Sequence, residues 1–448
     1  MRRKIYSKLL EWKIKSQGKT ALLIEGARRI GKSYIVNEFG KNEYKSYILV
    51  DFNDMDRELQ DIFENHLSNR NEFFMRLSLH FATKLYERNS LIIFDEVQQY
   101  PKARAAIKYL VADGRYDYIE TGSLVSIKKN VKNIVIPSEE EHIQMHPMDL
   151  EEFIWALGDD MIIDFVKEQF RKLEPIGTFH RKMMDYFRKY MVVGGMPQAV
   201  LEYIDSQDFE AVDKTKRNIL RLYREDIAKY ATGAESKAIA IFDEIPAMLQ
   251  RHERKFSPSS IKEGSKTREY EDAFFWLSDS KVVNICYNST EPNIGLRLNM
   301  DRTTLKCYMG DTGLLISMAF DENTIVNEQL YKKLILGKLE VNLGMLIENI
   351  VAQMLVSAGH KLYFYSNYDK AAENRMEIDF LIEKPAITSR HNICPLEVKS
   401  TTRYTYTSLE KFRKKYPQQL STPYILHTAD IMEKEGIIFL PLYTTMLL

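Results

Sequence analysis

One eight-residue segment, residues 26–33, constrains the fold of this chain more than any other. It fits the pattern G-x-x-x-x-G-K-[ST], in which a glycine-bearing loop between a strand and a helix surrounds a phosphate group. The flanks suit that context, because residues 20–24 form a short apolar run typical of a buried parallel strand. After the loop, Ile35, Val36 and Phe39 fall on one face of a helix. The flanks therefore favour a phosphate-binding loop in a parallel α/β sheet over a chance match.

The residue types in this loop suit a nucleotide phosphate. Backbone N–H groups and the dipole of the following helix attract negative charge. Gly26 and Gly31 allow backbone angles and a close approach that a Cβ atom would block. We expect Lys32 to contact the β- and γ-phosphates of ATP, and the Ser33 hydroxyl to help hold Mg²⁺. The residues expected to bind the nucleotide are Gly26, Ala27, Arg28, Arg29, Ile30, Gly31, Lys32 and Ser33.

A pair of acids follows the apolar run at residues 91–94. In open α/β sheets, ligands bind at the carboxyl ends of the strands, which is where Asp95 and Glu96 would lie. We expect Asp95 to hold Mg²⁺ and Glu96 to orient or deprotonate the attacking water. Many apolar strands end in an acid, so this pattern gains its weight from the phosphate loop that precedes it.

A third expected strand, in residues 117–123, has apolar residues at its centre and ends in Thr121, Gly122 and Ser123. A hydroxyl at the end of a neighbouring strand is placed to contact the γ-phosphate or the attacking water. The alternative is a strand that simply runs into a glycine turn. Arg28 and Arg29, which the loop pattern does not require, either sense phosphate or a neighbouring subunit, or are solvated.

Length and composition limit the partners of the chain. Its 448 residues exceed one ordinary core and predict two to four domains. The 63 basic and 63 acidic residues give a formal net charge of zero, so no overall field attracts nucleic acid or membranes. No apolar run is long enough for a transmembrane helix, and we expect no membrane partner. Three widely spaced cysteines predict reduced thiols, no structural zinc and a cytoplasmic location.

Four segments together resemble a prokaryotic family of AAA-superfamily ATPases, in which the ATPase domain precedes a C-terminal region long described as a domain of unknown function. The segments are Gly26–Ser33, Phe94–Glu96, Glu120–Ser123 and His146–Phe153. The resemblance covers nearly the whole chain and implies a parallel-sheet P-loop domain with Thr121 as its polar sensor. Relatives commonly work as rings with an arginine contributed in trans, but the sequence leaves the oligomeric state of this chain open. The sequence does not identify that arginine.

Residues 240–310 have the pattern of a winged helix-turn-helix. Residues 267–277 have the length and apolar face of a recognition helix, and residues 282–285 and 296–298 are the expected wing strands. Acidic residues are interspersed among the basic ones, so binding to DNA and binding to a protein partner both stay open. The residues that would face DNA are Lys262, Lys266, Thr267 and Arg268.

Four polar residues in the C-terminal third have the spacing of a carboxylate metal site with a lysine. Glu348 lies on an apolar helix, Asp379 on a strand, and Glu397 and Lys399 on the next strand. The carboxylates would hold Mg²⁺, and Lys399 would position a water or offset charge. The set resembles the PD-(D/E)xK nuclease-like fold, although Ile378 stands where that motif has proline. Three interpretations stay open: an active nuclease, a binding module of the same shape, or two strands joined by a Glu397–Lys399 ion pair.

The sequence therefore predicts an α/β protein of three parts. They are a parallel-sheet P-loop ATPase core over residues 1–155, a helical and winged-helix region over 156–320, and a restriction-endonuclease-like α/β domain over 330–448. The first expectation for function is hydrolysis of ATP to ADP and phosphate with Mg²⁺, with the cycle moving the two C-terminal parts. Two alternatives are an ATP-regulated, metal-dependent DNA nuclease and a nucleotide-switched module that binds DNA or an unknown protein.

Overall fold

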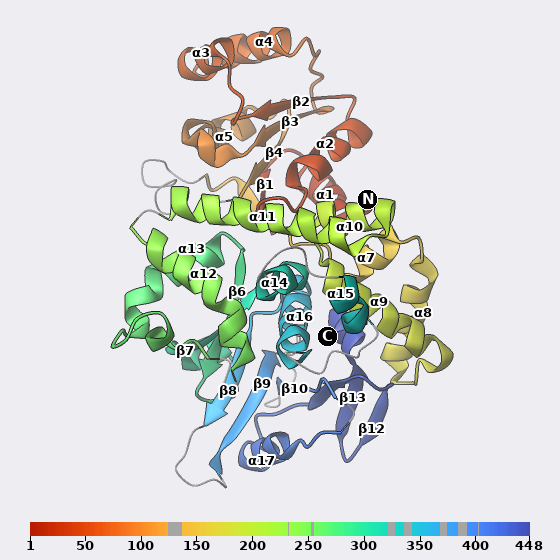
Figure 1. The fold of residues 1–448 in the computed structure, drawn as a ribbon. Helices are drawn as coiled ribbons and strands as arrows, with labels where there is room; N and C mark the ends of the chain where they lie inside the picture. The colour runs from red at the N-terminus through yellow and green to blue at the C-terminus, as the bar shows by residue number, and fades with distance from the viewer. Residues whose placement is uncertain are drawn as a thin grey trace. The chain divides into compact units, whose positions relative to one another are not determined.

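A computed structural model describes most of the chain, which forms two compact units. The N-terminal unit comprises Met1–His146 with Asp279–Lys281, and the C-terminal unit comprises Pro147–Ser278 with Val282–Leu448. Each unit has its own sheet (Figure 1). The residues that the structure describes are 1–123, 137–231, 233–251, 255–320, 328–335, 343–367, 374–383, 392–401 and 403–448.

The N-terminal unit is built on a five-stranded parallel sheet. Its strands are β1 Ala21–Glu25, β2 Ser46–Asp51, β3 Ser90–Asp95, β4 Asp117–Gly122 and β5 Glu140–Gln144. Their order is β2-β3-β4-β1-β5, and every neighbouring pair is parallel. β3 is buried along its whole length, which is why it reads as a continuous apolar run. Because the strands are parallel, their carboxyl ends meet at one edge of the sheet.

Helices cover both faces of this sheet (Figure 1). They are α1 Ile5–Ser16, α2 Lys32–Glu43, α3 Arg57–Asn65, α4 Arg70–His80, the 3-10 helix η1 Val97–Gln99 and α5 Pro101–Asp113. α3 and α4 contribute Phe63 and Phe74 to the core on one face. The residues that α2 buries, Ile35, Val36 and Phe39, lie outside that core. The helical face predicted after the phosphate loop is therefore confirmed.

The C-terminal unit begins with a helical region. Its helices are α7 Leu150–Ala156, α8 Asp160–Lys172, η2 Gly177–Phe179, α9 His180–Val193, α10 Pro197–Ser206, α11 Phe209–Tyr230, α12 Glu235–Gln250, η3 Pro258–Ser260, η4 Thr267–Tyr270, α13 Glu271–Asp279, α14 Thr312–Ala319 and α15 Glu328–Ile335. α7 starts with a capping box, in which Asp149 accepts the N–H of Glu152 at 2.9 Å and Glu152 accepts the N–H of Asp149 at 3.2 Å. This reciprocal pair fixes where α7 begins.

The turn between α9 and α10 packs tightly against the start of α14. A Cβ on Gly195 would lie 2.1 Å from the carbonyl oxygen of Met148, so only glycine fits there. The Gly195 N–H donates to Asp311 at 2.6 Å, and Asp311 also accepts the N–H of Leu314 at 3.0 Å as the N-cap of α14. One carboxylate therefore joins the turn to a helix start more than a hundred residues later.

The rest of the C-terminal unit is organised by an eight-stranded mixed sheet. Its strands are β6 Val283–Ser289, β7 Met300–Met309, β8 Tyr363–Asn367, β9 Met376–Glu383, β10 Ile393–Val398, β11 Tyr424–His427, β12 Met432–Lys434 and β13 Ile437–Pro441. The order is β12-β13-β11-β10-β9-β8-β6-β7. β6 pairs in parallel with β8, with Tyr287 opposite Tyr363. Segments on both sides of the expected boundary near residue 320 thus contribute to one sheet.

The wing expected from the sequence is only partly present. β6 contains the first expected wing strand, but residues 296–298 lie in the 3-10 helix η5 Leu296–Asn299. The physical reason is that Gly295 turns the chain at φ 77° and Leu296 is buried in the core of the sheet. The Leu296 N–H also donates to Glu383 at 2.8 Å. The expected recognition helix is likewise divided, into η4 and α13.

Three further helical segments accompany this sheet: α16 Leu343–Ser357, α17 Thr407–Lys415 and η7 Leu442–Leu447. α16 contacts β6, β7 and β10, and its side chains are buried from Met345 to Leu355. α17 packs against β9 and places Leu409 and Phe412 in a core shared with Ile378. In the described part of the chain, no helix combines the length and apolarity needed to cross a membrane.

Candidate functional site

The segment predicted to bind phosphate forms a tight loop between β1 and α2. Its last residue before the helix, Gly31, has φ 91°, a left-handed angle that favours glycine. A Cβ on Gly26 would lie 2.3 Å from the carbonyl oxygen of Met145, so this position also requires glycine. α2 begins at Lys32, and the loop therefore leads directly into a helix N-terminus, where backbone N–H groups bind anions.

Arg3 anchors this loop, and nothing in the local sequence indicated it. Its buried guanidinium donates from Nη1 to the carbonyl oxygen of Ile30 at 2.9 Å and from Nη2 to that of His146 at 2.7 Å. These partners lie 27 and 143 residues away in the chain, beyond the reach of any helical or strand periodicity. The basic N-terminal segment thus has a structural role beside the candidate site.

The side chain of Lys32 lies inside the phosphate loop. It donates from Nζ to the carbonyl oxygens of Gly26 at 3.0 Å and Ala27 at 2.9 Å, and the residue is only 4% exposed. Burial lowers the pKa of Lys32, and the nearby carboxylates of Glu96 and Asp95 partly oppose that shift. The predicted phosphate-binding cation is therefore held by the loop itself, close to both acids.

Three predicted site residues meet at one oxygen atom. Ser33 Oγ donates a hydrogen bond to Asp95 Oδ1 at 2.9 Å, and Thr121 Oγ1 donates to the same oxygen. They come from α2, β3 and β4, which the parallel sheet brings together at its carboxyl edge. Burial raises the pKa of Asp95, and the two hydroxyl donors offset part of that increase. A hydroxyl and a carboxylate in contact are the protein ligands that Mg²⁺ uses at phosphate loops, so these residues fit that ion.

Glu96 is oriented by its neighbours on two sides. Its backbone is left-handed at φ 53°, and its N–H donates to Thr121 Oγ1 at 3.2 Å. Its carboxylate accepts hydrogen bonds from Gln98 Nε2 and, at 3.3 Å, from Ser123 Oγ. The sequence interpretation assigned no role to Gln98 or Ser123. The available signals were an amide two residues after Glu96 and a hydroxyl two residues after Thr121.

An open pocket of about 730 Å³ borders Ser33 and Asp95 between α2 and β2. Tyr34 and Asp51 contribute to its lining, and Asp51 pairs in register with Asp95 on the neighbouring strand. The pocket therefore gives solvent and solutes access to the pair of residues that fit Mg²⁺. Arg28 and Arg29 of the loop are exposed, and both interpretations given for them stay predictions.

A cluster of acidic and basic side chains joins α5, β4 and β5. Arg104 Nη2 of α5 contacts Glu140 Oε2 at 2.7 Å, and His142 Nε2 lies 2.8 Å from the same oxygen. Its hydrogen bond to Glu140 raises the pKa of His142 to about 9. Burial opposes ionisation of Glu140, but His142 and Arg104 outweigh it and lower the pKa of Glu140 to about 2. Burial and the adjacent Glu140 raise the pKa of Glu120 well above its ordinary value.

Contacts link three of the four residues of the predicted nuclease-like set, and the fourth, Glu348, has other partners. Glu397 Oε2 lies 2.5 Å from Lys399 Nζ, and Asp379 Oδ2 accepts the N–H of Val398 at 2.8 Å, so three of the four are neighbours. Burial, with Asp379 close by, raises the pKa of Glu397 to about 7. Glu348 instead accepts hydrogen bonds from Lys306 Nζ at 3.2 Å and from a tyrosine hydroxyl. Within the described residues, no three acidic, histidine or cysteine side chains are arranged to hold a metal ion.

The residues expected to face DNA lie on a surface of mixed charge. Lys262, Lys266 and Arg268 are exposed, and so are the acids Glu263 and Glu269 beside them. The N–H of Lys266 donates to Glu269 at 3.2 Å. Alternating signs of charge weaken attraction to a phosphate backbone, so this surface does not by itself indicate DNA binding.

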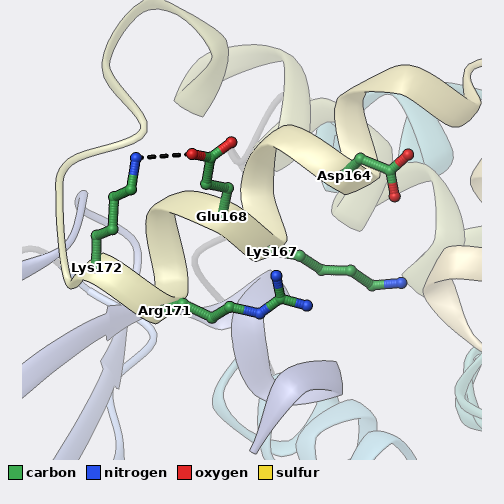
Figure 2. A pocket seen from close by; sticks show the side chains of 5 residues that line it. All are labelled: Asp164, Lys167, Glu168, Arg171 and Lys172. Atoms are coloured by element: carbon green, nitrogen blue, oxygen red, sulfur yellow. Dashed lines mark hydrogen bonds and ion pairs between the residues drawn. The ribbon is translucent and has the colours of Figure 1, made fainter.

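A second pocket, of about 540 Å³, lies along α8 in the C-terminal unit. Figure 2 shows Lys172 turned toward Glu168, and their charged groups are 2.7 Å apart. Lys167 is likewise paired, at 2.5 Å, with Glu151. Acidic and basic side chains alternate along this helix, and the pocket has no concentrated charge for a phosphate or a metal.

Family models match three parts of the chain. Residues 18–154 match a family described as an AAA domain. Residues 184–324 and 343–444 match two families described as domains of unknown function, DUF8612 and DUF4143. No curated protein sequence matches the chain. The AAA match, together with the loop and sheet described above, supports the interpretation of residues 18–154 as an AAA-superfamily P-loop domain.

Solved structures give a much weaker likeness. Orc1 of Aeropyrum pernix, solved in complex with DNA, is 11% identical at a TM-score of 0.29, over 72% of this chain and 93% of that one. Cdc6p of Pyrobaculum aerophilum is 13% identical at a TM-score of 0.28, over 76% and 96% of the two chains. TM-scores this low do not establish a shared fold for the whole chain. The winged-helix and nuclease-like assignments are confirmed by none of these comparisons.

Proposed function

We propose that the N-terminal unit binds ATP with Mg²⁺ and hydrolyses it to ADP and phosphate. The observation that carries this proposal is the meeting of Ser33 and Thr121 at Asp95 Oδ1, beside the ammonium of Lys32. The sequence predicted a phosphate loop and, supported by it, a magnesium-binding acid followed by a candidate base. The AAA-domain match over residues 18–154 supports the same class of function.

The roles follow from the contacts of each side chain. Lys32 and the loop N–H groups would hold the phosphates, and Ser33 with Asp95 would hold Mg²⁺. The ion supplies positive charge that offsets the negative charge developing on the transferred phosphoryl group. Glu96 would accept a proton from the attacking water, because its carboxylate lies next to the magnesium pair and is oriented there by Gln98 and Ser123. Thr121 would act through the two acids, since it donates to Asp95 and accepts from the N–H of Glu96.

The first experiment is phosphate release from ATP in Mg²⁺, combined with binding of a fluorescent ATP analogue. Lys32→Ala should lose both binding and hydrolysis, because the phosphates lose their cation. Glu96→Gln should keep binding and lose hydrolysis by about 10²- to 10⁴-fold, the usual contribution of a general base. Lys41→Ala, an exposed lysine on the same helix, is the matched control and should change neither. Wild-type hydrolysis in Lys32→Ala would overturn the proposal.

A DNA nuclease regulated by ATP is the second candidate. It is supported by the contact between Glu397 and Lys399 and by the nearby Asp379. The engagement of Glu348 by Lys306 counts against it. Cleavage of plasmid DNA in Mg²⁺ or Mn²⁺, with and without ATP, should be abolished by Lys399→Ala if this activity exists. Absence of cleavage from the wild-type protein would leave an ATPase whose C-terminal unit binds DNA or protein.

A further inference from the structure

A lysine lies among the acidic residues of the C-terminal sheet. Lys306 of β7 is completely buried, and its Nζ is 2.8 Å from Glu377 Oε1 and 3.2 Å from Glu348 Oε1. The same ammonium lies over the ring of Phe364, 5.0 Å from the ring centroid. One cation thus joins a carboxylate of α16 to a carboxylate of β9, and the aromatic face adds to its attraction.

A tyrosine completes the surroundings of Glu348. The hydroxyl of Tyr308, which is buried on the same strand as Lys306, donates to Glu348 Oε1 at 2.5 Å. That oxygen therefore accepts from both Lys306 and Tyr308. A metal ion using the same oxygen as a ligand would have to displace both donors, because they occupy the space in which the ion would sit.

We infer that Lys306 is a built-in cation that takes the place of a divalent metal ion between Glu348 and Glu377. Buried carboxylates require a counter-charge, and either a lysine or a metal ion can supply it. Here β7 supplies it, so Oε1 of Glu348 is already occupied by Lys306 and Tyr308 and is not open to the Mg²⁺ that the nuclease-like motif predicts. It follows that neutralising Lys306 should open a divalent-cation site at these two carboxylates. This inference concerns the C-terminal unit and is independent of ATP hydrolysis.

The test is Mn²⁺ binding to the nucleotide-free full-length protein, followed by electron paramagnetic resonance and by thermal unfolding. Every variant carries Asp95→Asn, which removes the magnesium-binding acid of the phosphate loop, so that bound Mn²⁺ reports on the C-terminal unit. With Lys306 present, we expect no bound Mn²⁺ that depends on Glu348 or Glu377. With Lys306→Met, we expect one Mn²⁺ per chain and a rise in the unfolding temperature when Mn²⁺ is added. Adding Glu348→Gln to Lys306→Met should remove that binding.

A matched control is available on the same aromatic ring. Lys255 Nζ lies 5.8 Å from the Phe364 centroid and donates to Ser366 Oγ at 3.0 Å. Lys255→Met removes a lysine near the same ring and leaves Lys306 in place between Glu348 and Glu377. It should therefore create no Mn²⁺ site, whereas a gain equal to that of Lys306→Met would overturn the assignment to Lys306.

The inference can also be tested if Lys306→Met does not fold without metal, because the variant leaves Glu348 and Glu377 without a positive charge. Lys306→Met that folds only in the presence of Mn²⁺ would support the inference, since the ion then restores the missing charge. The double variant Lys306→Met/Glu348→Gln removes one charge of each sign and should fold in a metal chelator. The inference is overturned by tight Mn²⁺ binding to Lys306-containing protein that Glu348→Gln abolishes. It is also overturned by a Lys306→Met protein that gains neither Mn²⁺ nor stability from it, or by a double variant that fails to fold.

Discussion

Ser33 and Asp95 are joined by a hydrogen bond of 2.9 Å, which links the first turn of α2 to the end of β3. We predict that Ser33→Ala raises the Mg²⁺ concentration needed for half-maximal ATP hydrolysis by roughly tenfold or more, because a ligand and a hydrogen bond that orients Asp95 are both lost. A magnesium titration of phosphate release measures this. Ser33→Thr keeps a hydroxyl and should stay near wild type, and an unchanged titration in Ser33→Ala would show that Ser33 does not serve the ion.

Thr121 connects the two acids, so we predict that Thr121→Val weakens both stability and hydrolysis. Valine has nearly the same shape but leaves the Glu96 N–H without its acceptor and removes one donor from Asp95. Loss of a buried hydrogen-bond partner costs about 1–3 kcal/mol, and the free energy of unfolding in urea measures it. Thr121→Ser retains the hydroxyl and should recover most of both properties. Wild-type stability and hydrolysis in Thr121→Val would show that the Thr121 hydroxyl serves neither property.

Gly26→Ala is predicted to impair nucleotide binding, since its Cβ would lie 2.3 Å from Met145 O and the loop would have to move. Overpacking of this kind costs about 1–3 kcal/mol of stability. Gly114→Ala provides the comparison, because Gly114 has φ 77° with open space around its Cβ position. It should lose stability through backbone strain while binding ATP normally. Titration with a fluorescent ATP analogue separates the two, and normal affinity in Gly26→Ala would contradict the prediction.

His142 should make the stability of the N-terminal unit depend on pH. Its folded-state pKa of about 9 lies above the ordinary value of 6.5, because its proton is shared with Glu140. The protonated form therefore stabilises the fold fully below about pH 6.5, and this contribution is lost as pH rises through about 9. Urea unfolding of wild type and His142→Asn at several pH values measures the difference, which should shrink with rising pH. A difference that stays constant from pH 6 to 10 would contradict it.

The phosphate loop and the strand ends were predictable because the information is local. The pattern around Lys32 fixes a strand, a turn and a helix start within a few residues, and a buried strand before Asp95 fixes the position of the acid. Arg3 and Gln98 were missed for opposite reasons. Arg3 contacts residues far along the chain, and Gln98 is close to Glu96 but has no distinctive pattern.

The carboxylate set near the C-terminus shows where local patterns fail. Asp379, Glu397 and Lys399 come from adjacent strands, and their alternation predicted that they would be neighbours. Glu348 pairs with Lys306, which lies in a segment that the sequence had indicated as the end of a winged helix. The hydrophobic pattern around Glu348 or Lys306 does not indicate that the two residues pair. They meet only when β6 and β7 join the C-terminal sheet.

The parallel pairing of Tyr287 with Tyr363 has a consequence for the order in which the protein is made. On the ribosome, β6 and β7 emerge well before β8 and can form their hairpin immediately. The edge of β6 that pairs with β8 keeps unpaired backbone N–H and C=O groups until the β8 segment has been synthesised. A nascent chain whose translation is arrested between Tyr287 and Tyr363 should therefore expose an unpaired edge of β6 that can bind other strands. Chaperone binding should be greatest over that interval of translation.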